Sequence, residues 1–514
     1  MDLPPRDVVL SLRDALHAAG YGYDAVAGLL GPTAHSALSR NETTPGLRAT
    51  GDGSALEAMV RLWLLQAPIP RGQADRALPG VVGPLVAAGL LSASGDEVRA
   101  LADVRPYAAS DTAGTAHASD ADWWVVSDLT PGLDGAPVAV APDHVLGISS
   151  ASTSLAQLTV REPVGRALDM GTGCGVQALH LARHAGHVVA TDVNERALTV
   201  TRLNAALNGV DLDVRAGSLF EPVADEGFDL VVTNPPFVVS AGTGERLVYR
   251  DSGLPGDEVV RQVVTAAPAH LNPGGWCQVL ANWVHRRGQP WQQRVGGWLE
   301  GPSTGPGLRG SCDAWVVQRE VADPAEYVEL WLKDAGVHGR PDYRQRYDAW
   351  LAWFDEQDVE AVGFGWLHLR RTVDDSREPV LHLEEWPYDI EQPLGGEVAD
   401  RGRRTDLLAG WSDERLLAAR LRVRVDVRQE TFGEPGGADP ESIVLRQQRG
   451  MRRARRVDTV EAGLVGACDG ELTVGRILDA LAALLDEDAD ALRRDRVAAV
   501  RGLVADGFLL PDSQ

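Results

Sequence analysis

The stretch Leu168-Asp169-Met170-Gly171-Thr172-Gly173-Cys174-Gly175 joins two apolar runs, one at 166–170 and one at 176–185. The first run predicts a short buried strand, and the second, with apolar residues at helical spacing, predicts a helix. Glycines in the turn between them let backbone N–H groups approach a ligand that any Cβ would block. The first N–H groups of the helix favour a polar or anionic group at the same place. We therefore expect a ligand at this turn.

A second apolar run, 187–191, ends in Asp192, about 20 residues after the first glycine. A carboxylate at the end of a second strand can accept hydrogen bonds from both hydroxyls of a ribose. A glycine-rich turn with such an acid is typical of dinucleotide sites, whose pattern is Gly-x-Gly-x-x-Gly. The pattern from Asp169 to Gly175 is instead Asp-x-Gly-x-Gly-x-Gly. This spacing argues against a dinucleotide.

The Asp169 to Gly175 pattern resembles the S-adenosylmethionine (SAM) loop of class I methyltransferases. The resemblance implies that Asp169 lies near the amino-acid end of SAM and that Asp192 holds its ribose. Residues 217–220 fall where the family places its adenine contacts, with Ser218 in place of the more usual acid. The resemblance thus assigns SAM binding to Asp169, Gly171, Thr172, Gly173, Gly175, Asp192, Val193, Ser218, Leu219 and Asn234.

Asn234-Pro235-Pro236-Phe237 closes a third apolar run, 228–233, and resembles the signature of methyltransferases that modify a planar nitrogen, either a base amine or a carboxamide. Such a nitrogen shares its lone pair with a π-system, so it attacks the methyl group only if acceptors hold its hydrogens. The Asn234 side-chain oxygen and the Pro235 carbonyl can be two such acceptors. The two prolines stiffen the turn, and Phe237 offers a face for stacking. We expect all four residues to be catalytic; the proton can leave after methyl transfer, so no strong base is required before attack.

The resemblance covers residues 150–372 and implies an α/β fold with a seven-stranded, mostly parallel, Rossmann-like sheet. Its motifs are similar to those of release-factor glutamine methyltransferases and RNA base-amine N-methyltransferases. A polar loop, 243–255, carries Tyr249, Arg250 and Asp251 and is expected to fold over the substrate. The remaining elements are an aromatic insertion at 323–358, a helix at 257–270, and strands at 212–216, 276–283, 314–319 and 361–370.

The chain on both sides of this domain predicts accessory domains. Residues 1–105 show helical spacing at 8–19, 54–65 and 81–91 and a strand at 97–102, which together predict a winged-helix-like domain. Residues 106–149 form a connecting segment with a strand at 123–126. Residues 373–514 predict a C-terminal accessory domain, with a strand at 421–427 and a winged-helix-like end at 472–485 and 491–510. Such domains can hold a substrate or form a homodimer.

Composition excludes several classes of protein. The chain has 514 residues, 44% of them hydrophobic, without an apolar run long enough for a membrane helix or a secretion signal, so we expect a cytoplasmic enzyme. Its four cysteines lie far apart, which predicts no disulfide framework and no metal site. Cys174 precedes a predicted helix, where a thiolate is favoured, but we expect it to pack beside SAM.

The substrate stays open between RNA and protein. A net charge of −24 works against binding of nucleic acid. However, residues 446–456 contain six arginines, in a segment that we expect to be helical, and these form either a solvated face or an arm for RNA. The alternatives to an N-methyltransferase acting on RNA or protein are a small-molecule methyltransferase of secondary metabolism and a non-catalytic scaffold that binds SAM.

Overall fold

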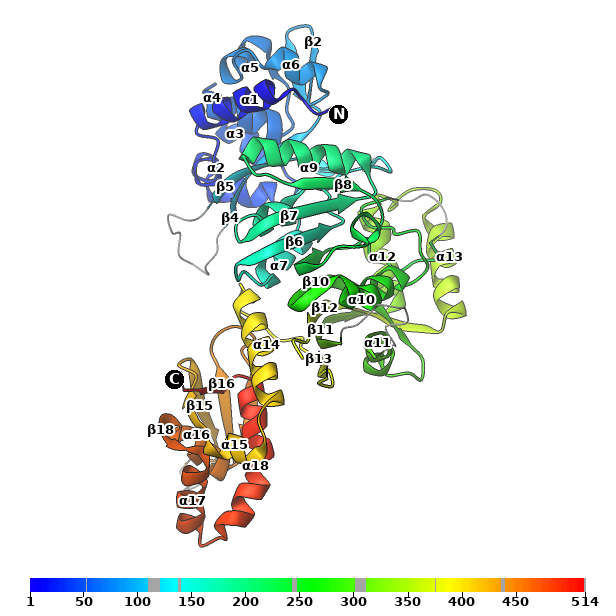
Figure 1. Ribbon diagram of the computed structural model, residues 1–514. Coiled ribbons are helices and arrows are strands. Elements are labelled where there is room, and N and C mark those ends of the chain that lie inside the picture. Colours follow the sequence, from blue (N-terminus) through cyan, green and yellow to red (C-terminus); the bar gives the residue numbers. More distant parts are fainter. Residues whose placement is uncertain are drawn as a thin grey trace. The chain divides into compact units, whose positions relative to one another are not determined.

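A computed structural model of the protein divides into two compact units (Figure 1). One unit comprises Met1–Ala156 and Arg161–Pro387, and the other comprises Gln157–Val160 and Tyr388–Gln514. The first therefore contains the predicted N-terminal domain and the predicted catalytic domain, except for Gln157–Val160. The structure describes residues 1–51, 53–109, 121–136, 140–242, 247–300, 311–374, 376–435 and 440–512.

An eight-stranded sheet forms the centre of the first unit, in the order β13-β11-β12-β10-β9-β6-β7-β8. Neighbouring strands pair in parallel, except that β12 runs antiparallel to both β10 and β11. These strands are β6 (Val164–Met170), β7 (Ala185–Asp192), β8 (Asp213–Ala216), β9 (Phe228–Thr233), β10 (Leu271–Arg286), β11 (Cys312–Ala322), β12 (Val359–Arg371) and β13 (Leu381–Glu385).

The predicted α/β fold with a mostly parallel sheet is confirmed, but the expected number of strands was wrong. The additional strand is β13, which pairs in parallel with β11, with Leu381 opposite Ala314. Its five residues are half-buried or exposed and include two glutamates, so the sequence there lacks the apolar run of a central strand.

Helices cover both faces of the sheet. On one face Ala167, Val188 and Leu230 pack against Leu155 and Leu181 of α7 and α8, and α9 lies beside β7 and β8. The opposite face carries α10 and α11. Since both faces are covered, β6, β7 and β9 end in runs of buried residues. These helices are α7 (Ser150–Leu158), α8 (Val176–Leu181), α9 (Glu195–Asn208), α10 (Glu258–His270) and α11 (Trp291–Leu299).

The predicted aromatic insertion between the last two expected strands is present as two helices, α12 (Pro324–Asp334) and α13 (Tyr343–Glu356). Tyr327 and Phe354 are fully buried in a cluster that includes Val239. The other aromatic residues of the insertion, such as Trp331, pack partly buried around it. The aromatic residues of the insertion therefore form a core of their own and not an open platform for stacking bases.

The N-terminal region is helical and ends in a hairpin, as predicted. A short strand pairs with the hairpin to give the order β1-β3-β2. Whether this arrangement is a winged helix stays a prediction. The elements are α1 (Arg6–Ala18), α2 (Tyr23–Leu38), α3 (Thr44–Ala49), α4 (Ala55–Met59), η1 (Val60–Leu64), β1 (Ile69–Pro70), α5 (Arg71–Ala77), α6 (Val82–Ala87), β2 (Leu91–Ser94) and β3 (Glu97–Ala100).

This N-terminal region packs directly on the catalytic domain. Leu203 and Leu207 of α9 belong to its hydrophobic core, and Figure 1 shows the first helices next to α9. The connecting segment adds the hairpin β4 (Asp103–Ala109) and β5 (Ala121–Ser127), which confirms the strand predicted at 123–126; residues 110–120 and 137–139 of that segment lie outside the described residues. Two short turns, η2 (Leu133–Gly135) and η3 (Glu221–Val223), complete this unit.

The second unit is a mixture of helices and short antiparallel strands. Its two sheets have the orders β18-β14-β19 and β15-β16-β17. The helices predicted near the end of the chain are present, but the winged-helix-like end stays a prediction. The elements are α14 (Gly395–Ala409), α15 (Asp413–Ala418), β14 (Arg420–Val423), β15 (Val427–Phe432), β16 (Ser442–Gln447), β17 (Ala454–Val457), α16 (Thr459–Ala467), β18 (Asp469–Thr473), α17 (Val474–Leu485), α18 (Ala489–Ala505) and β19 (Leu509–Pro511).

The arginine run at 446–456 is not helical, contrary to our expectation. The run spans the end of β16, a turn and the start of β17. Burial alternates along β16 with a period of two residues, which is the period of a strand and not of a helix. Several of its arginines pair with acids of the same unit: Arg446 with Glu430 (2.8 Å), Arg449 with Glu391 (3.1 Å) and Arg455 with Glu461 (3.6 Å).

The fully buried Asn204 side chain of α9 joins β5 to the glycine turn. It accepts a hydrogen bond from the Val126 N–H (2.7 Å) and donates to the carbonyls of Val126 (2.9 Å) and Cys174 (2.7 Å). Asn204→Ala leaves these groups unsatisfied and should lower the free energy of unfolding by about 2–4 kcal/mol, measured by chemical denaturation. As a control, Thr199→Ala removes only a hydrogen bond to the Glu195 carbonyl and should change it by less than about 0.5 kcal/mol. Equal stability of the two variants would contradict this role.

Candidate active site

A cavity of about 380 Å³ lies where β6, β7, β8 and β9 end. The carboxyl ends of parallel strands meet at one edge of a sheet, so the segments that follow them share this cavity. Gly175, Phe237 and Arg250 lie outside its lining. The predicted site residues that line it are Asp169, Gly171, Thr172, Gly173, Asp192, Val193, Ser218, Leu219, Asn234, Pro235, Pro236, Tyr249 and Asp251.

The glycine turn needs its glycines for two different reasons. Gly171 and Gly173 have φ values of 73° and 57°, and a Cβ on either would meet no protein atom within 4 Å, so open space lies beside both. Gly175, with φ of 82°, faces the protein instead, because a Cβ there would lie 3.1 Å from Thr201 of α9. The first two glycines therefore leave room for a ligand, whereas the third allows close packing of α9.

The Asp169 side chain holds the glycine turn in place by hydrogen bonds. Its Oδ2 accepts hydrogen bonds from the Thr172 hydroxyl (2.6 Å) and the Ala178 N–H (3.0 Å), which tie the turn to α8. Burial raises the pKa of this carboxyl to about 7, although the two hydrogen bonds act against the shift. Asp169 thus lines the cavity while its Oδ2 is used within the protein.

Asp192 is held by backbone groups on both of its oxygens. Oδ2 accepts from the Gly173 N–H (2.9 Å) and Oδ1 from the Asn194 N–H (2.8 Å), so the carboxylate is fixed beside the glycine turn. Burial raises its pKa more than these bonds lower it. Each carboxylate oxygen keeps a further lone pair, so the two oxygens together can accept hydrogen bonds from two hydroxyl groups.

The turn after β8 has a fixed shape. Gly217 has φ of 147°, and a Cβ there would overlap the Pro222 ring; Leu219 follows in a left-handed conformation with φ of 49°. Ser218 and Leu219 both line the cavity. Because β6 and β7 separate β8 from β9 in the sheet, this turn lies at the end of the cavity away from Asn234. The sequence assigned adenine to this turn.

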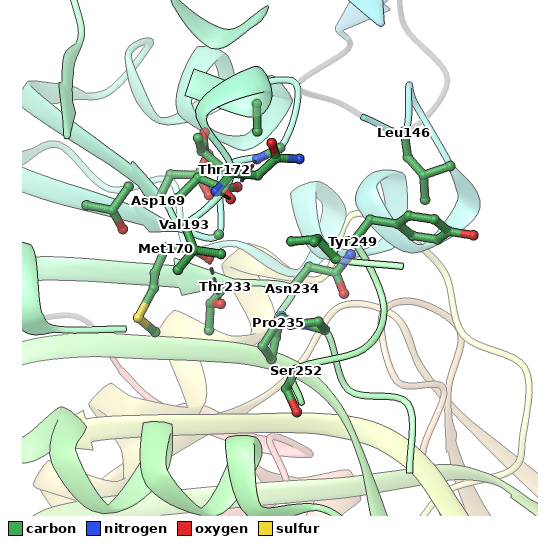
Figure 2. A pocket seen from close by; sticks show the side chains of 18 of the residues that line it. Leu146, Asp169, Met170, Thr172, Val193, Thr233, Asn234, Pro235, Tyr249 and Ser252 are labelled. Atoms are coloured by element: carbon green, nitrogen blue, oxygen red, sulfur yellow. Dashed lines mark hydrogen bonds between the residues drawn. The ribbon is translucent and has the colours of Figure 1, made fainter. Parts of the chain in front are cut away.

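Asn234 carries an acceptor without a partner. Its Oδ1 is buried and has no hydrogen bond within the described part of the chain. Buried polar atoms are nearly always hydrogen-bonded, so this atom marks a place where a ligand donates. Figure 2 shows Asn234 and Pro235 between the glycine turn and the segment that carries Tyr249. The Asn-Pro-Pro-Phe turn is anchored by Thr233, whose hydroxyl donates to the Met170 carbonyl (2.7 Å).

Phe237 does not face the cavity as we expected. It forms a bridge with Asp251, and its ring meets the Trp331 ring edge to face at 6.4 Å. Phe237 is therefore in contact with the insertion, and stacking of the substrate on its ring stays a prediction. Phe237 instead connects the Asn234 turn to α12.

The loop that carries Tyr249, Arg250 and Asp251 is attached to the insertion. The Tyr249 hydroxyl and Arg250 Nη1 both donate to Asp334 Oδ2 (3.1 and 3.0 Å), and Arg250 also donates to the Trp331 carbonyl (2.9 Å). Tyr249 and Asp251 reach the cavity, whereas Arg250 is used to hold the loop. Residues 243–246 of the predicted loop lie outside the described residues.

Sequence reasoning missed the segment before β6. Its contribution includes a Ser-rich helix start, where Ser149 and Ser152 bond to each other, and Gln177 donates to the Ser152 carbonyl (2.6 Å). That Ser-rich start is a helix-capping signal and could have placed α7 at the site. The residues of this segment that line the cavity are His144, Val145, Leu146, Gly147, Ser149 and Ser152, and Gln177 of α8 lines it as well.

Cys174 is buried, and burial raises the pKa of its thiol to about 11, so it stays protonated at neutral pH. It packs among apolar residues such as Trp123 and Val176. Among the described residues there is also no group of three or more His, Cys, Asp and Glu side chains arranged to hold a metal ion.

In comparisons with known proteins, residues 147–294 match the model of the Methyltransferase small domain. Residues 18–101 and 402–511 match two domains of unknown function, DUF7059 and DUF7782. The release factor glutamine methyltransferase of Geobacter sulfurreducens is 37% identical over 123 residues, which cover 22% of this chain and 43% of that protein. The ribosomal RNA small subunit methyltransferase C of Alcanivorax borkumensis is 35% identical over 118 residues, covering 23% and 32%. The chain thus spans less than half the length of either relative.

A solved structure with a similar domain is the T. thermophilus 16S rRNA N2 G1207 methyltransferase in complex with AdoMet and guanosine. It is 18% identical, covers 48% of this chain and 60% of that chain, and has a TM-score of 0.26.

The raised pKa of Asp169 predicts a pH dependence of stability. Because the folded-state pKa of about 7 exceeds the ordinary value of 3.8, stability from the protonated carboxyl is complete below about pH 4 and is lost as pH rises through 7. Asp169→Asn keeps an acceptor for Thr172 and Ala178 but cannot ionise. Between pH 5 and pH 8, melting temperature should therefore fall less in this variant than in the parent, measured by calorimetry.

The control for this experiment is Asp213→Asn. The hydrogen bond from Arg215 lowers the pKa of Asp213, so its contribution to stability is present at neutral pH and lost only as pH falls through that lowered value. Asp213→Asn should leave the fall between pH 5 and pH 8 unchanged. Parallel curves for Asp169→Asn and the parent would show that Asp169 is ionised throughout.

Proposed function

We propose that this protein is a SAM-dependent N-methyltransferase that transfers a methyl group to a planar nitrogen. The observation that carries the proposal is the buried, unpartnered Oδ1 of Asn234 in the same cavity as the glycine turn. A substrate N–H would satisfy this acceptor, and the Pro235 carbonyl can take a second hydrogen. Holding both hydrogens directs the nitrogen lone pair toward the methyl group.

The residues present fit SAM, which supplies the methyl group as a sulfonium. Asp192 would accept the ribose hydroxyls, and the open space at Gly171 and Gly173 would admit the amino-acid end of SAM. Ser218 and Leu219 would contact the adenine. These roles rest on the lining of the cavity and on the match to the Methyltransferase small domain.

For the substrate, a protein side-chain amide agrees best with the charges on this chain. Phosphate binding needs cationic groups, but arginines of the run at 446–456 are paired with acids. Asp251 lines the cavity, and Asp334 lies behind its loop. The named relatives include both glutamine and ribosomal RNA methyltransferases, so an RNA base amine is the second candidate.

We place this activity in the cytoplasm, with the flanking domains holding the substrate or a second copy of the chain. No helix among the described residues is long and apolar enough to cross a membrane. Incubation with labelled SAM and a fractionated lysate would identify the substrate. Label lost on protease treatment supports a protein, and label lost on RNase treatment supports RNA. Label confined to small molecules would contradict both.

Asp192→Ala tests the cofactor assignment. The change removes two charge-assisted hydrogen bonds, so SAM affinity measured by calorimetry should fall at least about tenfold. Glu195→Ala, an exposed acid outside the cavity, should leave the affinity unchanged. Unchanged SAM affinity in a folded Asp192→Ala variant would mean that Asp192 does not hold the ribose, and an NAD titration then tests the dinucleotide alternative.

Asn234→Ala tests catalysis separately from cofactor binding. SAM affinity should stay within a few-fold of the parent, while the rate of methyl transfer falls by a factor on the order of 10² to 10³, as for the loss of one preorganised polar group. Asn234→Asp keeps the acceptor oxygens and should retain part of the activity. Parental turnover in the Ala variant would remove Asn234 from the mechanism.

A further inference from the structure

His144 lies in the wall of the same cavity as Asn234, and its side chain is 9% exposed. The two residues before it are tied to both halves of the site. The Pro142 carbonyl accepts from the Val248 N–H (3.0 Å) of the substrate loop, and the Asp143 carbonyl accepts from Asn194 (2.9 Å) after β7. His144 is therefore fixed between the cofactor side and the substrate side.

A carboxylate stands behind the imidazole. Asp128 Oδ2 lies 3.7 Å from His144 Nδ1. Arg196 Nε contacts both Asp128 oxygens (3.1 and 2.9 Å), and the Val145 N–H donates to Oδ2 (2.8 Å). Burial raises the Asp128 pKa, but the hydrogen bonds from Arg196 and Val145 outweigh it and lower that pKa. An ionised, fixed carboxylate beside Nδ1 stabilises a positive charge on the ring.

On the other side, the imidazole meets the substrate loop. Its ring lies edge to face with the Tyr249 ring, with centroids 6.0 Å apart. Since Nδ1 faces Asp128, Nε2 is the ring nitrogen on the side away from the carboxylate. An acid, a histidine and a reacting group in this order are the usual arrangement for proton transfer.

We propose that His144 is a catalytic base, which takes the proton from the substrate nitrogen once the methyl group has been transferred. The inference rests on the proposed function, and it adds a residue to which the sequence assigned no role. Asp128 acts through His144 and is a positioning residue.

The step balances as follows in atoms and charge. The nitrogen lone pair forms the N–C bond to the methyl group while the C–S bond breaks, and its electrons leave with the sulfur as a neutral thioether. The positive charge passes to the substrate nitrogen. The N–H bond then breaks, its electrons return to nitrogen, and the proton goes to His144 Nε2. The imidazolium, paired with Asp128, later releases the proton to water.

Other titratable groups of the cavity are already used. Asp169 Oδ2 accepts from Thr172 and Ala178, and Asp192 holds two backbone N–H groups. Asp251 Oδ2 accepts from the Leu247 N–H (3.3 Å), and burial, with the charge of Asp334, raises the pKa of Tyr249. His144 is the one histidine in the wall of this cavity within the described ranges.

The charge state of His144 suits a base. Burial lowers its pKa below the ordinary value of 6.5, despite the opposing effect of nearby carboxylates, so the imidazole is neutral at pH 7. The kcat of the parent should therefore decrease as pH falls through this lowered pKa, when the imidazole becomes protonated. The groups that face it are Asp128, Arg196, Asp143, Asp334 and the Tyr249 ring.

His144→Gln tests this role in the full-length protein with the substrate found by labelling. We expect kcat at pH 7.5 to fall about 10²-fold, with SAM affinity by calorimetry within about twofold of the parent. The decrease of kcat on the acid side should disappear. Added imidazole should restore part of the activity of His144→Ala, which a purely structural defect would not allow.

The matched control is His187→Gln. His187 Nε2 lies 3.7 Å from Asp213 Oδ2, so it forms a similar pair outside the cavity, and its loss should change neither kcat nor the pH profile. Parental kcat and pH profile in His144→Gln would overturn the base while leaving the proposed function intact. Loss of SAM affinity in both His144→Gln and His144→Asn would also overturn it. A parent protein that labels no substrate would instead overturn the proposed function.

Discussion

The cavity depends on the parallel pairing of β6 with both of its neighbours. In this register Met170 lies opposite Thr191 of β7 and opposite Thr233 of β9, and the Thr233 hydroxyl bonds to the Met170 carbonyl. Each strand then leaves the sheet at the same level. The next residue along each strand is Gly171, Asp192 or Asn234, so these three residues, which are far apart in sequence, come together at one edge of the sheet. A one-residue slip of either pairing would turn the side chains of that strand to the opposite face and separate these groups.

Much of this arrangement could be predicted from sequence, because buried parallel strands are continuous apolar runs and their ends are marked by glycine, acid or proline. Elements without such a signal could not. The five residues of β13 are amphipathic, and the run at 446–456 has arginines on both strands of a hairpin, so neither shows its structure by composition. The contribution of His144 was also hidden, since it comes from a polar connecting segment and reaches the cavity only through tertiary contacts.

The aromatic insertion holds the segment that follows the Asn-Pro-Pro-Phe turn. The Tyr327 hydroxyl accepts from the Val239 N–H (2.8 Å) and the Asn282 amide (3.1 Å), and Trp350 Nε1 donates to the Val239 carbonyl (3.1 Å). Val239 lies two residues after Phe237, which ends the Asn-Pro-Pro-Phe turn. Two prolines restrict that turn from within, and the insertion restricts it from behind. The aromatic residues thus support a rigid acceptor, which is a condition for electrostatic preorganisation.

The shared core of the N-terminal region and α9 limits how this protein can be divided. Leu203 and Leu207 are fully buried in a cluster whose other members come from the N-terminal region and the β4–β5 hairpin and not from the central sheet. The same helix begins just after Asp192, at the cofactor end of the cavity. A fragment that begins at β6, the strand before the glycine turn, would therefore expose an apolar strip on α9, and it would be prone to aggregate. For protein engineering, the N-terminal region shares its hydrophobic core with the catalytic domain, so it cannot be exchanged as a separate module.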